Sequence, residues 1–313
     1  MAHITFIHGI GNKPEPAALL NDWRVALFDQ DGLDLEAIGV TSSMVYWADL
    51  LYASPVPAGT GQESSALEVE LTVDSGDADL RWLDDVPEEE RLFVERLGLE
   101  FGLAEVTATP DELAPDPIVP GSPLEAIPLP EGLKRRLMRV LLRDVHHFLY
   151  NVSFSPRPGE TYQIRTDVRA RVLEKLRDAA SCPGPHLLVG HSLGSVIAYD
   201  ALTAIDGAPK IDALLTVGSP LGISEVREGL TPPWTSQDGW PSQRVGDGRW
   251  SNVFDALDPV CGLLDRVIGK HYRRAGAIRV EDMGVSNTGS WRHSIGKYLG
   301  QPQLRTFMRE VIG

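Results

Sequence analysis

The sequence predicts an α/β fold with a mainly parallel central sheet and helices on both faces. The main observation is that short apolar segments alternate with longer segments in which apolar residues recur at helical spacing. Consecutive strands that are joined by a helix pair in parallel. A second observation is that small and polar residues directly follow several apolar segments. In parallel sheets of this kind, ligands bind at the carboxyl ends of the strands.

The amino-terminal part begins regularly and then loses its pattern. The first elements expected are a buried strand at 3–7, a helix at 14–28 and a second strand at 43–50. From about residue 53 to 130, Pro, Gly and acidic residues dominate, and only short helices near 80–83 and 88–101 are expected. Residues 131–150 then predict an amphipathic helix.

Regularity returns after Glu160. The elements expected there are a helix at 163–180, a strand at 186–189, a helix at 195–205, strands at 213–217, 251–254 and 277–282, and a last helix at 295–312. We therefore expect a core formed by residues 1–52 and 150–313, with residues 53–149 inserted as a large acidic cap or lid. We also expect about residues 60–125 of this insertion to bury few apolar residues and to open at little cost.

The excess of negative charge is confined to the insertion. The formal net charge is −15, and residues 61–125 alone contain 18 acidic residues against three arginines. Phosphate binding needs clustered Lys and Arg, so this composition argues against a nucleic-acid partner. A cationic run at 134–143 is expected to be partly neutralised by the acidic stretch rather than to face an anionic membrane.

Composition and the start of the chain predict a cytoplasmic protein. No window approaches the roughly 18–20 apolar residues of a membrane span, and the first residues lack the features of a secretory signal. Cys182 and Cys261 suggest reduced thiols rather than a disulfide framework. His146 and His147 have no further ligand at matching spacing, so we expect them at the surface, with neither metal nor cofactor bound.

A candidate nucleophile lies in the segment Gly-His-Ser-Leu-Gly at 190–194. The pattern Gly-x-Ser-x-Gly follows an apolar strand and opens a helix, which is the context of a nucleophile elbow. There the serine occupies a strained turn, and a side chain at either glycine would collide with a neighbouring strand or helix. The dipole at the start of the helix favours the negative charge that develops nearby. Ser192 is therefore the expected nucleophile.

A serine nucleophile needs a base, and the base needs an acid that orients it. After such an elbow, the chain order is Ser, then Asp or Glu, then His. His271 precedes the last strand and would lie at the wrong end of the sheet, so His293, which follows that strand, is the expected base. Asp258 begins a rigid Asp-Pro-Val turn beyond a strand end and is favoured as the acid. Asp255 is the alternative, and Asp265 is expected within a helix.

An oxyanion hole needs two hydrogen-bond donors. Leu193, directly after the serine, offers one backbone N–H. The second is expected from the glycine-rich loop at 8–11, whose backbone can approach a substrate carbonyl closely, and we favour the N–H of Ile10. A later loop at 231–249, which contains Trp234 and Trp240, either lines a substrate pocket or packs in the core.

Taken together, these motifs resemble the lipase and serine-esterase branch of the α/β-hydrolase superfamily. The matching segments are His8-Gly9, 144–150, 190–195, 199–202, 218–222, 258–260 and His293-Ser294. Within that branch, the chain is most similar to the intracellular DDHD-type phospholipases and related predicted serine esterases, over roughly residues 1–12 and 144–300. The resemblance implies the α/β-hydrolase fold and ester hydrolysis, and it supports Asp258 over Asp255 and His293 over His271.

The expected activity is hydrolysis of a carboxylic ester through a Ser-His-Asp triad and an acyl-enzyme. The expected partner is a small-molecule or lipid ester, with at most peripheral lipid contact. An amidase or peptidase would use the same triad. An alternative of a different class is a non-catalytic binding protein with this fold; such proteins tend to lose a triad member, whereas Ser192, Asp258 and His293 are all present.

Overall fold

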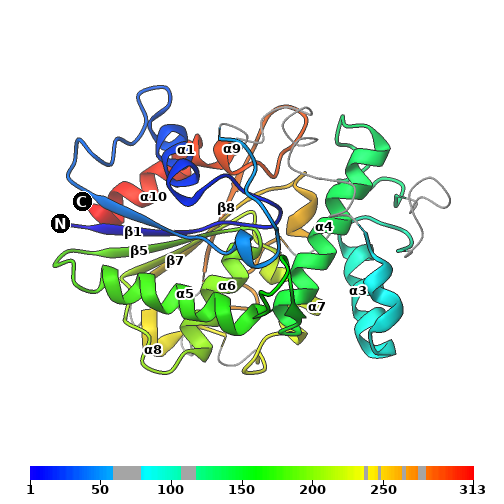
Figure 1. Ribbon diagram of the computed structural model, residues 1–313. Helices are drawn as coiled ribbons and strands as arrows, with labels where there is room; N and C mark the ends of the chain where they lie inside the picture. Colours follow the sequence, from blue (N-terminus) through cyan, green and yellow to red (C-terminus); the bar gives the residue numbers. More distant parts are fainter. Residues whose placement is uncertain (59–78, 107–117, 236–238, 246–247, 263–265, 274–279) are drawn as a thin grey trace.

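The computed structural model describes residues 1–58, 79–106, 118–235, 239–245, 248–262, 266–273 and 280–313. A six-stranded sheet with the order β2-β1-β5-β6-β7-β8 lies at the centre, and all neighbouring strands are parallel (Figure 1). Its strands are β1 (His3–Ile7), β2 (Thr41–Val45), β5 (His186–His191), β6 (Ala213–Val217), β7 (Arg249–Asp255) and β8 (Glu281–Val285). Two short antiparallel strands, β3 (Ser153–Phe154) and β4 (Tyr162–Gln163), pair separately.

Helices cover both faces of the sheet, as predicted (Figure 1). One face holds α1 (Pro16–Phe28), α9 (Ile295–Leu299) and α10 (Pro302–Ile312), and the other holds α5 (Ile164–Ala179), α6 (Leu193–Ala204) and α8 (Ser242–Val245). Helices α3 (Glu88–Glu100) and α4 (Glu131–Leu149) lie beyond the strand ends, on the right of the figure, and α7 (Ser224–Glu228) is a short helix below α4. Single 3-10 turns lie at Ala48–Leu50, Arg81–Asp85, Pro220–Gly222 and Pro259–Cys261. The predicted α/β class is confirmed.

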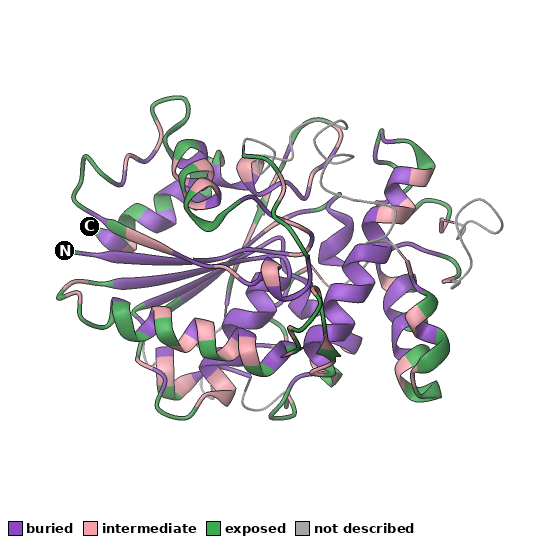
Figure 2. Ribbon diagram, viewed as in Figure 1, coloured by how far each residue is buried: buried purple, intermediate pink, exposed green. Residues whose placement is uncertain are grey.

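The central strands divide their side chains between two apolar clusters, one on each face. In β1, Ile4 and Phe6 pack with α1, α9 and α10, whereas Ile7 packs on the opposite face. In β5, Val189 packs on the same face as Ile4 and Phe6, and Leu188 packs on the opposite face with Ile7. Strands buried on both faces are almost continuously apolar, which is why they are readable in the sequence. Figure 2 shows this buried sheet between half-exposed helices.

Three predicted elements differ from the structure. The expected helix at 295–312 is two helices, because Pro302 lacks a backbone N–H and cannot continue α9. The second strand is Thr41–Val45 rather than 43–50. It ends at Val45, which pairs with Ile7 at the end of β1, and the chain then turns. The last strand is Glu281–Val285 rather than 277–282, and residues 274–279 lie outside the described residues.

The described part of the insertion packs against the core, which differs from the expectation that it buries little. Leu80, Phe93, Val94 and Leu97 are buried in the same apolar cluster as α4 and α6. The cationic run is partly buried as well. Lys134 pairs with Glu131 at 2.9 Å, and Arg139 and Arg143 are also buried.

The prediction that His146 and His147 lie at the surface is wrong. Their exposed fractions are 0% and 3%, because α4 is covered by α3 on one side and by α5 on another. His146 Nε2 lies 2.7 Å from Oε2 of Glu90, and the His146 ring packs against Trp82. Burial lowers the pKa of His147 to about 3.

Candidate active site

The candidate residues follow five different strands and meet at one edge of the sheet. The loop at 8–11 follows β1, Ser192 follows β5, Gly218 follows β6, Asp258 follows β7 and His293 follows β8. In a parallel sheet the carboxyl ends of the strands lie side by side. Residues that are far apart in sequence can therefore form one site.

The turn between β5 and α6 holds Ser192 in a conformation that L-residues rarely adopt, with φ 54° and ψ −130°. Its neighbours permit the turn because they lack side chains. A Cβ on Gly194 would lie 2.3 Å from the carbonyl oxygen of Ile7, and a Cβ on Gly190 would lie 2.5 Å from the carbonyl oxygen of Gly194. Ser195 also donates its hydroxyl to the carbonyl of Ser192 at 2.6 Å. A strained serine between two glycines that admit no side chain is the geometry expected of a nucleophile elbow.

The candidate acid and base are hydrogen-bonded to each other. His293 Nδ1 lies 2.8 Å from Oδ2 of Asp258. The Tyr298 hydroxyl donates to the same oxygen at 2.7 Å, and the Val260 N–H donates to Oδ1 at 2.9 Å. Burial acts to raise the pKa of Asp258, but His293 and these donors outweigh it, so the pKa lies below its usual value. The ionised carboxylate keeps the proton of His293 on Nδ1 and leaves Nε2 as an acceptor.

Asp255, the alternative acid, is bonded elsewhere. Its Oδ1 accepts the N–H of Leu257 at 2.7 Å, and its Oδ2 accepts the N–H of Asn287 at 2.5 Å and pairs with Arg292 at 3.1 Å. These contacts tie the loop after β7 to the loop that precedes His293. Asp255 therefore has a structural role in both loops. Asp265 lies outside the described residues, and the ring of His271 packs edge-on against Trp234.

His191, the residue before the serine, contacts the candidate base directly. Its Nε2 donates to the carbonyl oxygen of His293 at 2.9 Å, and the two imidazoles stack at 4.6 Å. Burial holds the pKa of His191 well below the ordinary value. The neutral ring therefore holds the backbone of His293 without placing a second positive charge beside it.

Ser192 and His293 both lie within this cluster, but they do not form a hydrogen bond. The Ser192 N–H donates to the carbonyl of Val217 at 2.9 Å. Gly218 follows Val217 in the chain, and a Cβ on Gly218 would lie 3.1 Å from both His293 Nδ1 and Asp258 Oδ2. Oγ of Ser192 and Nε2 of His293 are buried and have no hydrogen-bond partner among the described residues. Catalytic hydrogen bonds are often formed only once substrate is bound.

The loop at 8–11 lies against the serine. A Cβ on Gly9 would lie 2.6 Å from the Cβ of Ser192, so only glycine permits this approach. Gly11 has φ 80° and donates its N–H to Oδ2 of Asp144 at 2.8 Å. Ile10 lies between these two glycines, and Leu193 is the first residue of α6. Of the two residues predicted to supply oxyanion donors, Ile10 follows the glycine that lies against Ser192, and Leu193 follows Ser192 itself.

Two adjoining cavities, of about 380 and 600 Å³, open beside the loops of the acid and the base. Pro123 and Ala126 of the insertion line both cavities, together with Leu257. Arg292 lines the smaller cavity and Arg266 the larger one. Leu257 and Arg292 are the chain neighbours of Asp258 and His293, whereas Ser192, Asp258 and His293 themselves line neither cavity.

The loop at 231–249 borders a different cavity. This cavity, of about 410 Å³, is lined by Trp234 and Trp240 and by the second half of α6. Trp240 is buried and packs against Trp250. Of the two interpretations of this loop, packing in the core therefore applies at least to Trp240.

Sequence reasoning missed Tyr298, His191 and Asp144. Tyr298 lies only five residues beyond His293, but nothing in a short helical segment marks a hydroxyl that reaches Asp258. His191 occupies the variable position of the elbow motif, where any residue fits the pattern. Asp144 lies in a segment covered by the family resemblance, but its contact with Gly11 joins residues 133 positions apart, which no local pattern indicates.

The described residues include neither a candidate membrane-spanning helix nor a candidate metal site. No helix there is long and apolar enough to cross a bilayer. No group of three or more His, Cys, Asp or Glu residues there is arranged to hold a metal ion.

The chain matches no protein-family model and no curated protein. Among solved structures, it is similar to a proposed YdeN-like hydrolase from Pectobacterium atrosepticum, with 19% identity over 50% of this chain and 76% of that one, at a TM-score of 0.30. It is also similar to an uncharacterized protein from Pseudomonas aeruginosa, with 9% identity over 91% of this chain and 40% of that one, at a TM-score of 0.28. Likenesses of this extent say nothing of the reaction.

Proposed function

We propose that the protein is a serine hydrolase that cleaves carboxylic esters through Ser192, His293 and Asp258. The observation that supports this most is the 2.8 Å contact between His293 and a buried, ionised Asp258 at the edge where Ser192 occupies its strained turn. A buried carboxylate is costly unless it has donors. Asp258 would hold the imidazole of His293 in the single tautomer that a general base requires.

In the proposed reaction, Ser192 attacks the ester carbonyl while Nε2 of His293 takes the hydroxyl proton. Asp258 stabilises the imidazolium that forms, and the N–H groups of Leu193 and Ile10 donate to the oxyanion. His293 then protonates the leaving alcohol, which departs and leaves an acyl-enzyme. Water, activated by His293, attacks the acyl group and releases the acid and the free serine.

The experiment that tests this uses a fluorophosphonate probe, with intact mass as the readout, beside turnover of p-nitrophenyl esters. Wild type should gain one probe, and Ser192→Ala should gain none and lose roughly 10⁶-fold in turnover. Labelling that persists in Ser192→Ala would refute the nucleophile. A wild-type protein that neither labels nor hydrolyses would favour the non-catalytic binding protein, and p-nitroanilides beside the esters would separate an amidase from an esterase.

We also propose that residues 53–149 form a cap that selects the substrate. The support is that Pro123 and Ala126, on the insertion, share two cavities with Leu257 beside the proposed acid. Pro123, Ala126 and Leu257 offer apolar contacts to an acyl chain, while Arg292 and Arg266 each add a positive charge to the lining of one cavity.

A further inference from the structure

The glycine-rich loop after β1 is held on one side by the imidazole of His8. The backbone N–H of Trp47 donates to Nε2 of His8 at 3.0 Å, so that nitrogen has no proton. Burial, with Lys13 and Arg171 nearby, lowers the pKa of His8 to about 3, and the ring is neutral at pH 7. Its single proton is therefore on Nδ1, which donates to the carbonyl oxygen of Gly9 at 2.8 Å.

The His8 ring has little freedom to move. It stacks on the indole of Trp47 at 4.8 Å with an angle of 10° between the planes. The indole N–H of Trp47 also donates to the carbonyl of His8 at 3.0 Å. The exposed fraction of His8 is 0%. The direction in which Nδ1 donates is thus fixed by the packing.

This contact sets the orientation of the peptide between Gly9 and Ile10. In a trans peptide, the carbonyl and the N–H point in opposite directions. Since the Gly9 carbonyl points at His8, the Ile10 N–H points away from it. The loop at this point lies against Ser192, because a Cβ on Gly9 would meet the Cβ of Ser192 at 2.6 Å.

The other side of the loop is held by Asp144 of α4. Its Oδ2 accepts the N–H of Gly11 at 2.8 Å and the hydroxyl of Tyr52 at 2.9 Å. Arg143 donates twice to Oδ1, at 3.1 and 3.0 Å. Asp144 is fully buried. The carboxylate thus has partners for both oxygens and fixes the peptide that follows Ile10.

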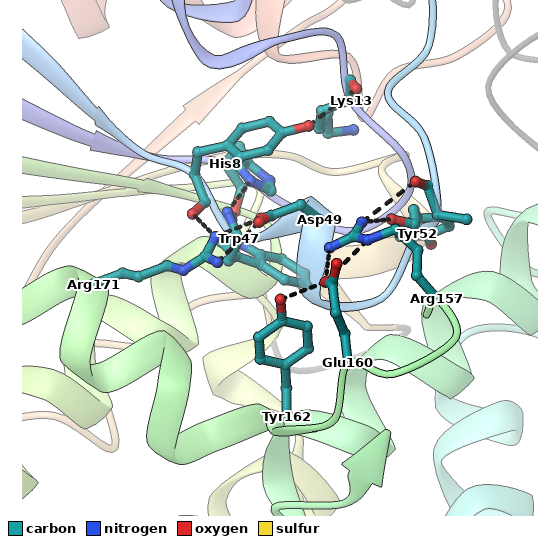
Figure 3. A network of polar contacts seen from close by, with 11 residues as sticks. His8, Lys13, Trp47, Asp49, Tyr52, Arg157, Glu160, Tyr162 and Arg171 are labelled. Carbon is teal, nitrogen blue, oxygen red and sulfur yellow. Dashed lines mark hydrogen bonds and ion pairs between the residues drawn. The ribbon is translucent and has the colours of Figure 1, made fainter. Parts of the chain in front are cut away.

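The chain segment that provides Trp47 and Tyr52 is itself tied down (Figure 3). Arg171 of α5 pairs with Asp49. Arg157 donates to the carbonyl of Tyr52 at 3.2 Å. These contacts lie outside the loop, and they keep the partners of His8 and Asp144 in place.

We propose that His8 and Asp144 are positioning residues that preset the Ile10 N–H as the second oxyanion donor. The inference rests on the proposed ester hydrolysis and adds to it two residues that touch no reacting atom. It also assigns a part of the oxyanion hole to α4, a helix of the insertion. Preset donors stabilise the charge of a transition state without reorganising during the reaction.

Two substitutions of His8 separate its two hydrogen bonds. The amide nitrogen of Asn can replace Nδ1 and still donate to Gly9, whereas the amide oxygen of Gln can replace Nε2 and still accept from Trp47. We expect His8→Gln to lower kcat on p-nitrophenyl acetate by roughly 10- to 100-fold with little change in KM, and His8→Asn to recover most of that loss. The affinity for an alkyl trifluoromethyl ketone, which forms a tetrahedral adduct, should fall by the same factor as kcat.

Asp144→Asn is the second variant, and it should also lower kcat more than it changes KM. Thr5→Val is the control. It removes a buried hydrogen bond to His186 (2.9 Å) from the same strand, so it should lower the melting temperature and leave kcat unchanged.

Equal losses of kcat in His8→Gln and His8→Asn that follow their melting temperatures would overturn the inference, as would full activity in His8→Gln. If wild type neither reacts with the fluorophosphonate nor hydrolyses esters, the proposed function fails and this inference fails with it. If wild type is labelled at Ser192 but the variants show unchanged kinetics, this inference is refuted and the proposed function is not.

Discussion

At the scale of single residues, Asp258 shows how a buried charge can be retained. Three donors, from His293, Tyr298 and Val260, share its two oxygens. Tyr298 also accepts the N–H of Asp255 at 2.9 Å, so its hydroxyl proton is directed to Asp258. The two neighbouring aspartates therefore have different partners, and kinetics can separate their roles.

Asp258→Asn should lower kcat by about 10⁴, because an amide facing Nδ1 favours the wrong imidazole tautomer. Asp255→Asn leaves the Asp258–His293 contact in place, so it should lower stability through Arg292 and Asn287 and affect kcat far less. Turnover of p-nitrophenyl acetate, measured with thermal unfolding for both variants, checks this. Reversed kinetic losses would show that Asp255 is the acid.

At the scale of elements, strands and helices were more predictable than their contacts. Strand β6 was predicted with its observed bounds, and β5 and β7 within two residues, because strands buried on both faces are continuously apolar. The burial of α3 was missed, since its exposed acidic residues Glu88, Glu89 and Glu95 dominate its composition. On α4, the burial of His146 and His147 was missed because it depends on the packing of α3 and α5 against that helix. Ser192 and His293 were inferred from motif and strand order, and Asp258 from its Asp-Pro-Val turn and the family resemblance, whereas Tyr298 and Asp144 depend on packing that no local pattern encodes.

The cavities between the insertion and the loop at 256–257 give the cap a specific test. Ala126 is exposed and lines both cavities, so Ala126→Trp should fill space that a long acyl chain needs. Each excluded methylene forfeits about 0.8 kcal/mol. The rate on p-nitrophenyl decanoate relative to acetate should then fall roughly tenfold or more.

The matched control is Ala37→Trp, another exposed alanine, in the turn before β2. It should leave the ratio of decanoate to acetate rates unchanged. If Ala126→Trp lowers both rates equally, the substitution disturbs the catalytic residues and the cavities do not select the acyl chain.

At the scale of the whole molecule, several buried histidines make stability depend on pH. Burial lowers the pKa of His8 and His147 to about 3 and that of His186 to about 4. In the unfolded chain each titrates near 6.5. As pH falls below that value, the unfolded state binds protons that the folded state cannot, so the free energy of unfolding decreases. Stability should be retained above about pH 6.5 and lost towards pH 4.

His147→Gln isolates one of these groups, which faces Arg143 and His146 on α4. Between about pH 5.5 and 4, the variant should lose stability less steeply than wild type, by about 1.4 kcal/mol per pH unit. Urea unfolding at a series of pH values measures the slope. Val145→Ala, a buried neighbour, should lower stability at every pH and keep the wild-type slope; an unchanged slope in His147→Gln would mean that His147 is protonated in the folded protein.

The positive φ of Ser192 lowers the free energy of unfolding at the position of the proposed nucleophile. Of the 20 residues, only glycine adopts this conformation without strain, and strain of this kind costs about 1–3 kcal/mol. Because Oγ of Ser192 has no hydrogen-bond partner among the described residues, its removal breaks no hydrogen bond there. Ser192→Gly should therefore unfold at higher denaturant than Ser192→Ala, by about 1 kcal/mol, and both should be inactive. Glycine would thus be the more stable residue at this position, and under the proposed function the loss of stability at Ser192 accompanies its role as nucleophile.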